Sequence, residues 1–290
     1  MVGSALILLR EGLEGALIVA IVLAYLRKLG RREQFSAIWL GTAAAVGISA
    51  GVGVGLFLTV GELQGDARKL TFALIMGAAA GVLTWMIFWM RRQARAIKGE
   101  LEHKVDQALV VGSTFALATV VFIGVLREGI ETALFFLAAA GQTSTVEALV
   151  GGTLGLIAAL VLAYAFYRGA SWLNLRQFFM VSGAIVLLFA AGLLARSFAE
   201  LQVLGLIPTF WHPVFDATSL GFLSTDHFVG ELLRGLFGWD PIPSIEELAV
   251  WALYIAVVGT LYFRGVTRPA PLKRLRERAA RQPAPEASDA

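Results

Sequence analysis

Residues 9–17 read LREGLEGAL, and residues 126–134 read LREGIETAL. Each stretch places an arginine and two glutamates near the middle of a hydrophobic segment that is long enough to cross a bilayer. A charged group at that depth costs about 3 kcal/mol even on lenient insertion scales, so it is rarely retained without a function. Because the pattern occurs twice in the same register, it indicates a membrane protein that handles ions.

The composition agrees with a membrane location. Of the 290 residues, 58% are hydrophobic and only 16% are charged, and the mean hydropathy is +0.75, whereas a soluble domain carries roughly 25% charged residues. The chain has no cysteine and three histidines, so thiolate chemistry is excluded and zinc ligands are scarce. A metal site in this chain would consist mostly of oxygen ligands, which hard cations prefer.

Seven apolar segments are long enough to cross the membrane as helices, so we predict an all-α integral membrane protein with seven transmembrane helices. They cover residues 4–26, 36–60, 70–90, 108–140, 146–167, 178–195 and 248–263. The fourth is overlong, and we expect part of it to extend beyond the hydrocarbon or to tilt. The first contains the charged motif and has no basic region before it, so we interpret it as a span and not as a signal peptide.

Basic residues gather in alternate connections and in the C-terminal segment. They include Arg27, Lys28, Arg31, Arg32, Arg91, Arg92, Arg95, Lys98, Lys104, Arg168 and Arg176, followed by seven more after residue 263. By the positive-inside rule, the N-terminus lies outside and the C-terminus lies in the cytoplasm. We expect residues 1–267 to form one transmembrane domain, and residues 268–290 to form a disordered basic tail in the cytoplasm.

The repeated motif predicts an inverted repeat. The first predicted span runs inward and the fourth runs outward, so about residues 1–95 and 105–198 form two inverted halves of three helices each. The seventh helix, 248–263, lies outside the repeat and is additional to the two halves. Repeats of this kind place a substrate site near the bilayer midplane, where the halves meet. Glycine pairs spaced by four, such as Gly47 with Gly51, Gly51 with Gly55, and Gly151 with Gly155, predict close helix packing.

The spacing within each motif is chemically specific. Glutamates at i and i+3 project from one face of a helix, and each arginine precedes the second glutamate by four residues, within reach of an ion pair. Four carboxylates facing two guanidinium groups leave a net charge of about minus two, which a multivalent cation would balance. The predicted metal ligands are Glu11, Glu14, Glu128 and Glu131, and the charge-balancing and orienting residues are Arg10 and Arg127.

The long external loop, residues 196–247, is predominantly acidic. Within it the apolar residues of 228–237 fall on one helical face, which is typical of an interfacial helix lying over the outer opening. Four residues of this loop are candidates for collecting metal ions: Asp216, Asp226, His227 and Glu231. The alternative is that these side chains are simply solvated.

At these motifs the sequence resembles the oxidase-dependent iron permease family, which includes fungal high-affinity iron permeases and the permease of the bacterial Efe iron-uptake system. The family motif is R-E-x-x-E in the first and fourth of seven spans, and residues 10–14 and 127–131 match it. The external residues 215–219, 230–233 and 238–239 are similar to the bacterial branch. The resemblance extends from the first predicted span through the seventh.

This resemblance implies a high-affinity iron permease and not an enzyme, located in the cytoplasmic (inner) membrane as a multi-pass protein. Iron would be the transported substrate, bound by the motif glutamates, and no permanently bound cofactor is expected. All-oxygen ligation favours ferric over ferrous iron. The implied partners are the lipid bilayer and a separate periplasmic or extracellular oxidase, peroxidase or binding protein that delivers iron. No nucleic-acid partner is expected.

Other functions fit parts of the pattern. A transporter of another divalent metal, such as manganese or lead, would use the same carboxylates. An anion carrier would use Arg10 and Arg127 to bind a carboxylate or phosphate, but acids exceed bases at the site. A membrane di-iron carboxylate oxidase would use Glu-x-x-His pairs, and no histidine falls in a predicted span. Purely structural ion pairs would leave acid in excess, which is destabilising when buried.

Overall fold

The computed structural model describes residues 1–93, 97–110, 114–140, 144–168, 175–219 and 227–267, and every regular element among them is helical. Six long helices are α1 (Val2–Lys28), α2 (Phe35–Glu62), α3 (Gly65–Gln93), α5 (Thr114–Ala140), α6 (Thr145–Tyr167) and α7 (Leu175–Val203). A final helical run consists of α9 (Ile245–Tyr254), the π-helical turn η3 (Ile255–Gly259) and α10 (Thr260–Thr267). The shorter elements are η1 (Arg32–Gln34), α4 (Ile97–Val110) and α8 (Phe228–Phe237).

The chain is an integral membrane protein. Within the described residues, five helices are long and apolar enough to cross a bilayer: Arg32–Glu62, Gly65–Met90, Thr145–Tyr167, Gln177–Val203 and Ile245–Arg264. Helices α1 and α5 have a comparable length of 27 residues each, but each carries the charged motif near its middle. Length and apolar composition alone therefore identify five of the seven predicted spans.

Two predicted boundaries are corrected by the structure. The overlong segment 108–140 is divided, because residues 108–110 belong to α4 and α5 begins at Thr114. A helix of 27 residues is about 40 Å long, which already suffices to cross the membrane. The sixth helix, α7, continues to Val203 and so enters the predicted external loop. Its last turns are supported by the i,i+4 ion pair of Arg196 with Glu200.

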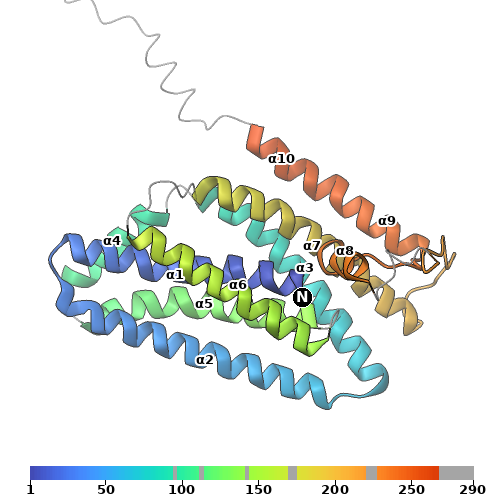
Figure 1. Ribbon diagram of the computed structural model, residues 1–290, viewed down its shortest axis with the longest axis horizontal. Helices are drawn as coiled ribbons and strands as arrows, with labels where there is room; N and C mark the ends of the chain where they lie inside the picture. Colours follow the sequence, from blue (N-terminus) through green and yellow to red (C-terminus); the bar gives the residue numbers. More distant parts are fainter. Residues whose placement is uncertain (94–96, 111–113, 141–143, 169–174, 220–226, 268–290) are drawn as a thin grey trace, which may run out of the picture.

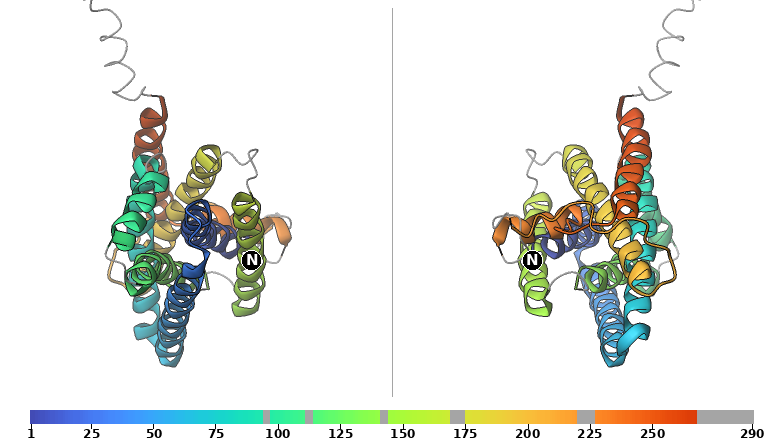
Figure 2. Two further views of the ribbon diagram at one scale, coloured as in Figure 1. Left: turned by 90° about the vertical axis from the view of Figure 1, so that its left-hand side faces the viewer. Right: turned by 90° about the vertical axis from the view of Figure 1, so that its right-hand side faces the viewer.

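The long helices pack in a reciprocal pattern. Helix α1 packs along α6 and α5 packs along α2, while α3 packs along α7. In Figure 1, α1 and α6 run in one direction and α2 and α5 run in the opposite one. The end views in Figure 2 show α1 between α5 and α6, and α1 also contacts α5. The opening helix of each half of the chain therefore packs on the second helix of the other half.

Glycines permit the closest of these helix contacts. A Cβ atom at Gly151 or Gly155 of α6 would overlap the Met1 or Ala5 carbonyl of α1, as predicted for this pair. The prediction is wrong for Gly47, Gly51 and Gly55, because nothing lies within 4 Å of a Cβ built at any of them. These three glycines face away from the described helices.

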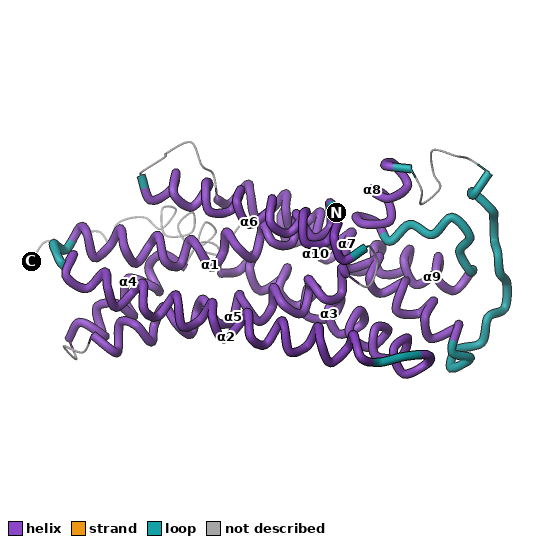
Figure 3. Tube along the Cα trace, turned by 60° about the horizontal axis from the view of Figure 1, so that its bottom comes forward, coloured by secondary structure: helices purple, strands orange, loops and turns teal. Residues whose placement is uncertain are grey.

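The longest irregular segment lies at one end of the bundle. Its described parts are residues 204–219, which follow α7, and residues 238–244, which connect α8 to α9, and Figure 3 shows these loops at that end of the bundle. Helix α8 contacts both α7 and α1, and its end is fixed where Gly238, with φ of 68°, lies against Gly192 of α7. The Trp251 indole of α9 donates a hydrogen bond to the Phe237 carbonyl at 2.8 Å. The predicted helix of residues 228–237 is present and packs on the end of the bundle.

Candidate metal centre

The two charged motifs occupy the inner faces of α1 and α5. In α1, Arg10, Glu11 and Glu14 are buried, with exposed fractions of 2%, 1% and 5%. In α5, Glu128 is buried, whereas Glu131 and Arg127 are partly exposed. The helical spacing turns each set of charges inward, because residues at i, i+3 and i+4 share a face. The α1 charges and Glu128 therefore lie within the protein, whereas the Arg127 side chain is 33% exposed.

Ion pairs form within each helix as the spacing predicts. The Arg10 guanidinium contacts Glu11 through Nη1 and Glu14 through Nη2, each at 3.3 Å. In α5, Arg127 Nε donates to Glu131 Oε1 at 2.9 Å. Each arginine therefore neutralises the second glutamate of its own motif, and Arg10 also contacts the first.

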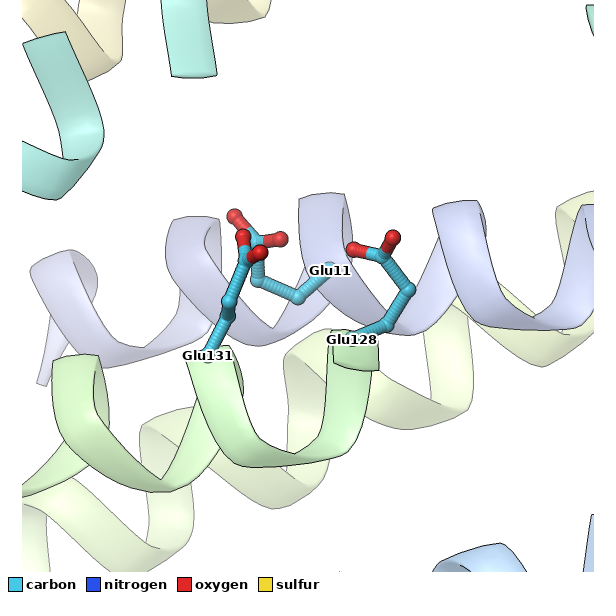
Figure 4. Close-up of side chains that lie close together, drawn as sticks. All are labelled: Glu11, Glu128 and Glu131. Atoms are coloured by element: carbon cyan, nitrogen blue, oxygen red, sulfur yellow. The ribbon is translucent and has the colours of Figure 1, made fainter. Parts of the chain in front are cut away.

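Three carboxylates from the two helices converge. One oxygen each of Glu11, Glu128 and Glu131 lies within 4.8 Å of the other two, and Figure 4 shows the three side chains pointing toward one another. Within the described part of the chain this is the one group of three or more His, Cys, Asp or Glu residues with such proximity. Glu14 lies beside Arg10 and outside the group.

The group retains free ligand atoms. In each of Glu11, Glu128 and Glu131, the Oε2 atom is buried and has no hydrogen-bond partner. Buried acceptors without partners are costly and call for a ligand, a proton or water. A hard cation bonded at about 2.0–2.6 Å separates its ligand oxygens by about 3–5 Å, which is the scale of this group. The three carboxylates can therefore share one cation.

A cavity of about 960 Å³ adjoins the acids. It lies among α1, α2, α5 and α6, and Glu11 and Glu128 are part of its lining, together with Ser49 and Thr132. Most of the remaining lining is apolar. The two carboxylates therefore line the inner part of a cavity whose lining also includes exposed residues such as Trp39 and Tyr164, and this cavity gives room for an ion near them.

Sequence reasoning missed the contribution of α3. The Arg127 Cζ atom lies 4.2 Å from the ring centroid of Trp89 and 5.6 Å from that of Trp85. The i,i+4 spacing of the two tryptophans signals a shared helix face. Their partner could not be identified from sequence, because it lies on another helix.

The candidate external residues do not form a cluster in the described structure. Asp216 is exposed and accepts hydrogen bonds from the Thr218 backbone N–H at 2.9 Å and from its hydroxyl at 2.5 Å, which lower the pKa of Asp216 below its usual value. His227 is exposed and immediately precedes α8. Asp226 and the side chain of Glu231 lie outside the described part of the structure. A collecting role for these residues stays a prediction.

Buried carboxylates that converge from two membrane helices are typical of ion-handling membrane proteins, and comparison with known proteins identifies this one as a membrane transporter. The chain matches the iron permease FTR1 family over residues 1–268, and it belongs to that family. It is therefore a permease and not an enzyme, which confirms the resemblance seen in the motifs and removes the oxidase alternative.

Its relatives include bacterial permeases. The ferrous iron permease EfeU of Escherichia coli O157:H7 is 38% identical over 252 residues, which cover 86% of this chain and 91% of the relative. The ferrous iron permease EfeU of Yersinia pestis is 35% identical over 260 residues, covering 89% and 92%. No solved structure matches this chain.

Proposed function

We propose that this iron permease binds iron at the bilayer midplane, between the R-E-x-x-E motifs of α1 and α5. The observation that carries the proposal is the convergence of Glu11, Glu128 and Glu131, each with a free buried oxygen. Carboxylates at that separation bind hard cations without a histidine or a thiolate. Glu14 completes the acid set as the partner of Arg10, so that four acids and two arginines leave a net charge that an iron ion balances.

The proposed architecture has seven spans, namely α1, α2, α3, α5, α6, α7 and the continuous run from α9 to α10. Its halves are inverted repeats, with the N-terminus outside and the C-terminus in the cytoplasm. The reciprocal packing of α1 on α6 and of α5 on α2 supports this arrangement. The basic ends of α1 and α6, at Lys28 and Arg168, support the orientation, because basic residues stay on the cytoplasmic side.

Ferric iron is the ion that we propose the site holds more tightly, because carboxylate oxygens are hard ligands and a trivalent ion gains more from the acid excess. Ferrous iron is the second candidate, and the names of the EfeU relatives favour it. Manganese and lead remain weaker competitors for the same oxygens. We also propose that the protein lies in the cytoplasmic membrane and receives iron from a separate protein outside it.

Transport in liposomes tests the site and the substrate together. Purified protein is reconstituted, and uptake of ferric citrate, ascorbate-reduced ferrous iron and manganese is measured with and without a pH gradient. Glu11→Gln, Glu128→Gln and Glu131→Gln are expected to abolish or greatly reduce iron uptake, because an amide keeps the size and loses the charge. Glu62→Gln, at the exposed end of α2, is the matched control. Parental uptake in the triple Gln variant would refute the site.

A further inference from the structure

The two motif arginines are held in different ways. The Arg10 guanidinium is 2% exposed and is shared between Glu11 and Glu14. Arg127 contacts Glu131 through Nε, and the rest of its guanidinium lies over tryptophans of α3. Equivalent positions in a repeated motif therefore have unequal partners, and the difference comes from a third helix.

Trp85 and Trp89 form an aromatic platform on α3. Their rings are stacked, with centroids 6.0 Å apart and an interplanar angle of 20°. Arg127 Cζ lies 4.2 Å from the Trp89 centroid, which is within the distance of a strong cation–π contact, and 5.6 Å from that of Trp85. Tryptophan is the best aromatic partner for a cation, and arginine is the cation most often found on it.

Arg127 makes different contacts with the two glutamates of its motif. Glu128 is next to Arg127 in sequence, yet the ion pair of Arg127 is with Glu131, and Glu128 Oε2 has no hydrogen-bond partner. In α1 the corresponding first glutamate, Glu11, does contact its arginine. A guanidinium that left the tryptophan faces would find Glu128 within reach of a side-chain rotation, and it would compete there with a metal ion.

We propose that Trp89, assisted by Trp85, is a positioning residue that holds the Arg127 guanidinium away from Glu128 and so keeps Glu128 available as an iron ligand. The inference rests on the proposed function of the acid group. It assigns a role in the metal centre to α3, a helix that contributes no charge to it. The tryptophans touch Arg127 and need not touch the ion.

The first experiment compares Trp89 variants in the liposome assay. Trp89→Leu removes the aromatic face and keeps an apolar side chain, so the iron concentration for half-maximal uptake should rise roughly tenfold. Trp89→Phe keeps a weaker face and should restore part of the affinity, and Trp85→Leu should have a smaller effect because its ring lies farther from Arg127. The matched control is Phe72→Leu, which removes the ring beneath Arg68 on the same helix, where Arg68 Cζ lies 5.7 Å from the centroid.

The second experiment is a double-mutant cycle, which separates positioning from folding. In an Arg127→Gln background there is no guanidinium to hold, so Trp89→Leu should add no further change in the half-saturating iron concentration. The same additional loss in both backgrounds would overturn the inference, because it would indicate a packing role. Trp89→Leu with an unchanged half-saturating concentration would overturn it as well.

Glu128→Gln in the same assay distinguishes this inference from the function on which it rests. If Glu128→Gln loses uptake while Trp89→Leu behaves as the parent, only the platform is refuted. If Glu128→Gln transports iron at the parental rate and half-saturation, the metal centre itself is refuted.

Discussion

The glutamates of the two motifs differ in their contacts, and we expect them to differ in their contribution to iron binding. Glu128 lies in the three-carboxylate group and has a buried oxygen without a hydrogen-bond partner, whereas Glu14 is paired with Arg10 and lies outside the group. We therefore expect Glu128→Gln to weaken iron binding more than Glu14→Gln does. Isothermal titration of the detergent-solubilised variants with ferric citrate measures the difference. Equal losses of affinity at the two positions would show that Glu14 binds the ion directly.

Arg10 supports a second prediction, because its planar guanidinium contacts two carboxylates at once. A lysine keeps the charge but offers a single ammonium group, which cannot replace that fork. Arg10→Lys should therefore slow transport by roughly tenfold while iron binding persists, since removing a geometric contact of this kind costs about 1–2 kcal/mol. Arg10→Gln is the comparison, and it should be worse because it also removes the charge. Identical loss of iron binding in both variants would contradict a charge-balancing role.

At the scale of single residues, the sequence predicted the contacts between side chains of the same helix. The i,i+4 pairs of Arg10 with Glu14 and of Arg127 with Glu131 follow from helical spacing, and both are present. The separation of Glu14 from the other three acids was not predictable, and neither was the stacking of Arg127 on Trp89. Those features depend on how α1, α3 and α5 pack, and periodicity along one segment carries no information about that packing.

Among the helices, the contact of α1 with α6 is the most sensitive to side-chain size. A Cβ atom at Gly155 would overlap the Ala5 carbonyl and lie 2.9 Å from the Leu9 nitrogen. Because that neighbour is backbone, Gly155→Ala should destabilise the protein by about 1–3 kcal/mol. Gly51→Ala on α2 is the matched control, since nothing lies within 4 Å of the added Cβ there. Thermal unfolding in detergent should show a lower midpoint for the first variant, and equal midpoints would contradict the close contact.

Helix existence was easier to predict than helix ends or helix faces. All seven apolar segments correspond to helices, because hydropathy reports burial in the bilayer directly. The extension of α7 to Val203 includes the ion pair of Arg196 with Glu200, a local contact that a hydropathy average does not report. The glycines of α2 were assigned to packing from their spacing, yet they face away from the described helices. Spacing identifies a smooth helix face and does not identify its neighbour.

At the scale of the whole molecule, the connection between α7 and α9, which the sequence predicts to be external, carries acidic residues of its own. Arg196 on α7 joins Asp240 at 2.7 Å, so this ion pair ties the segment after α8 to the end of the bundle. Asp216 belongs to the exposed part before α8, where it faces solvent. Hydrogen bonds from Thr218 lower the pKa of Asp216, so its carboxylate keeps its charge to a lower pH than a free aspartate does.

A collecting role predicts an effect on ion encounter and none on the transport step. Exposed acids raise the local cation concentration, and salt screens that attraction over about 10 Å at 0.1 M. Replacing Asp216, Asp226 and Glu231 together by Asn, Asn and Gln should raise the half-saturating iron concentration a few-fold, leave the maximal rate nearly unchanged and weaken the salt dependence of uptake. Glu33→Gln, in the predicted cytoplasmic connection, controls for loss of an acid elsewhere. If the triple variant loses maximal rate at an unchanged half-saturation, these residues act in folding or gating, and the collecting role is wrong.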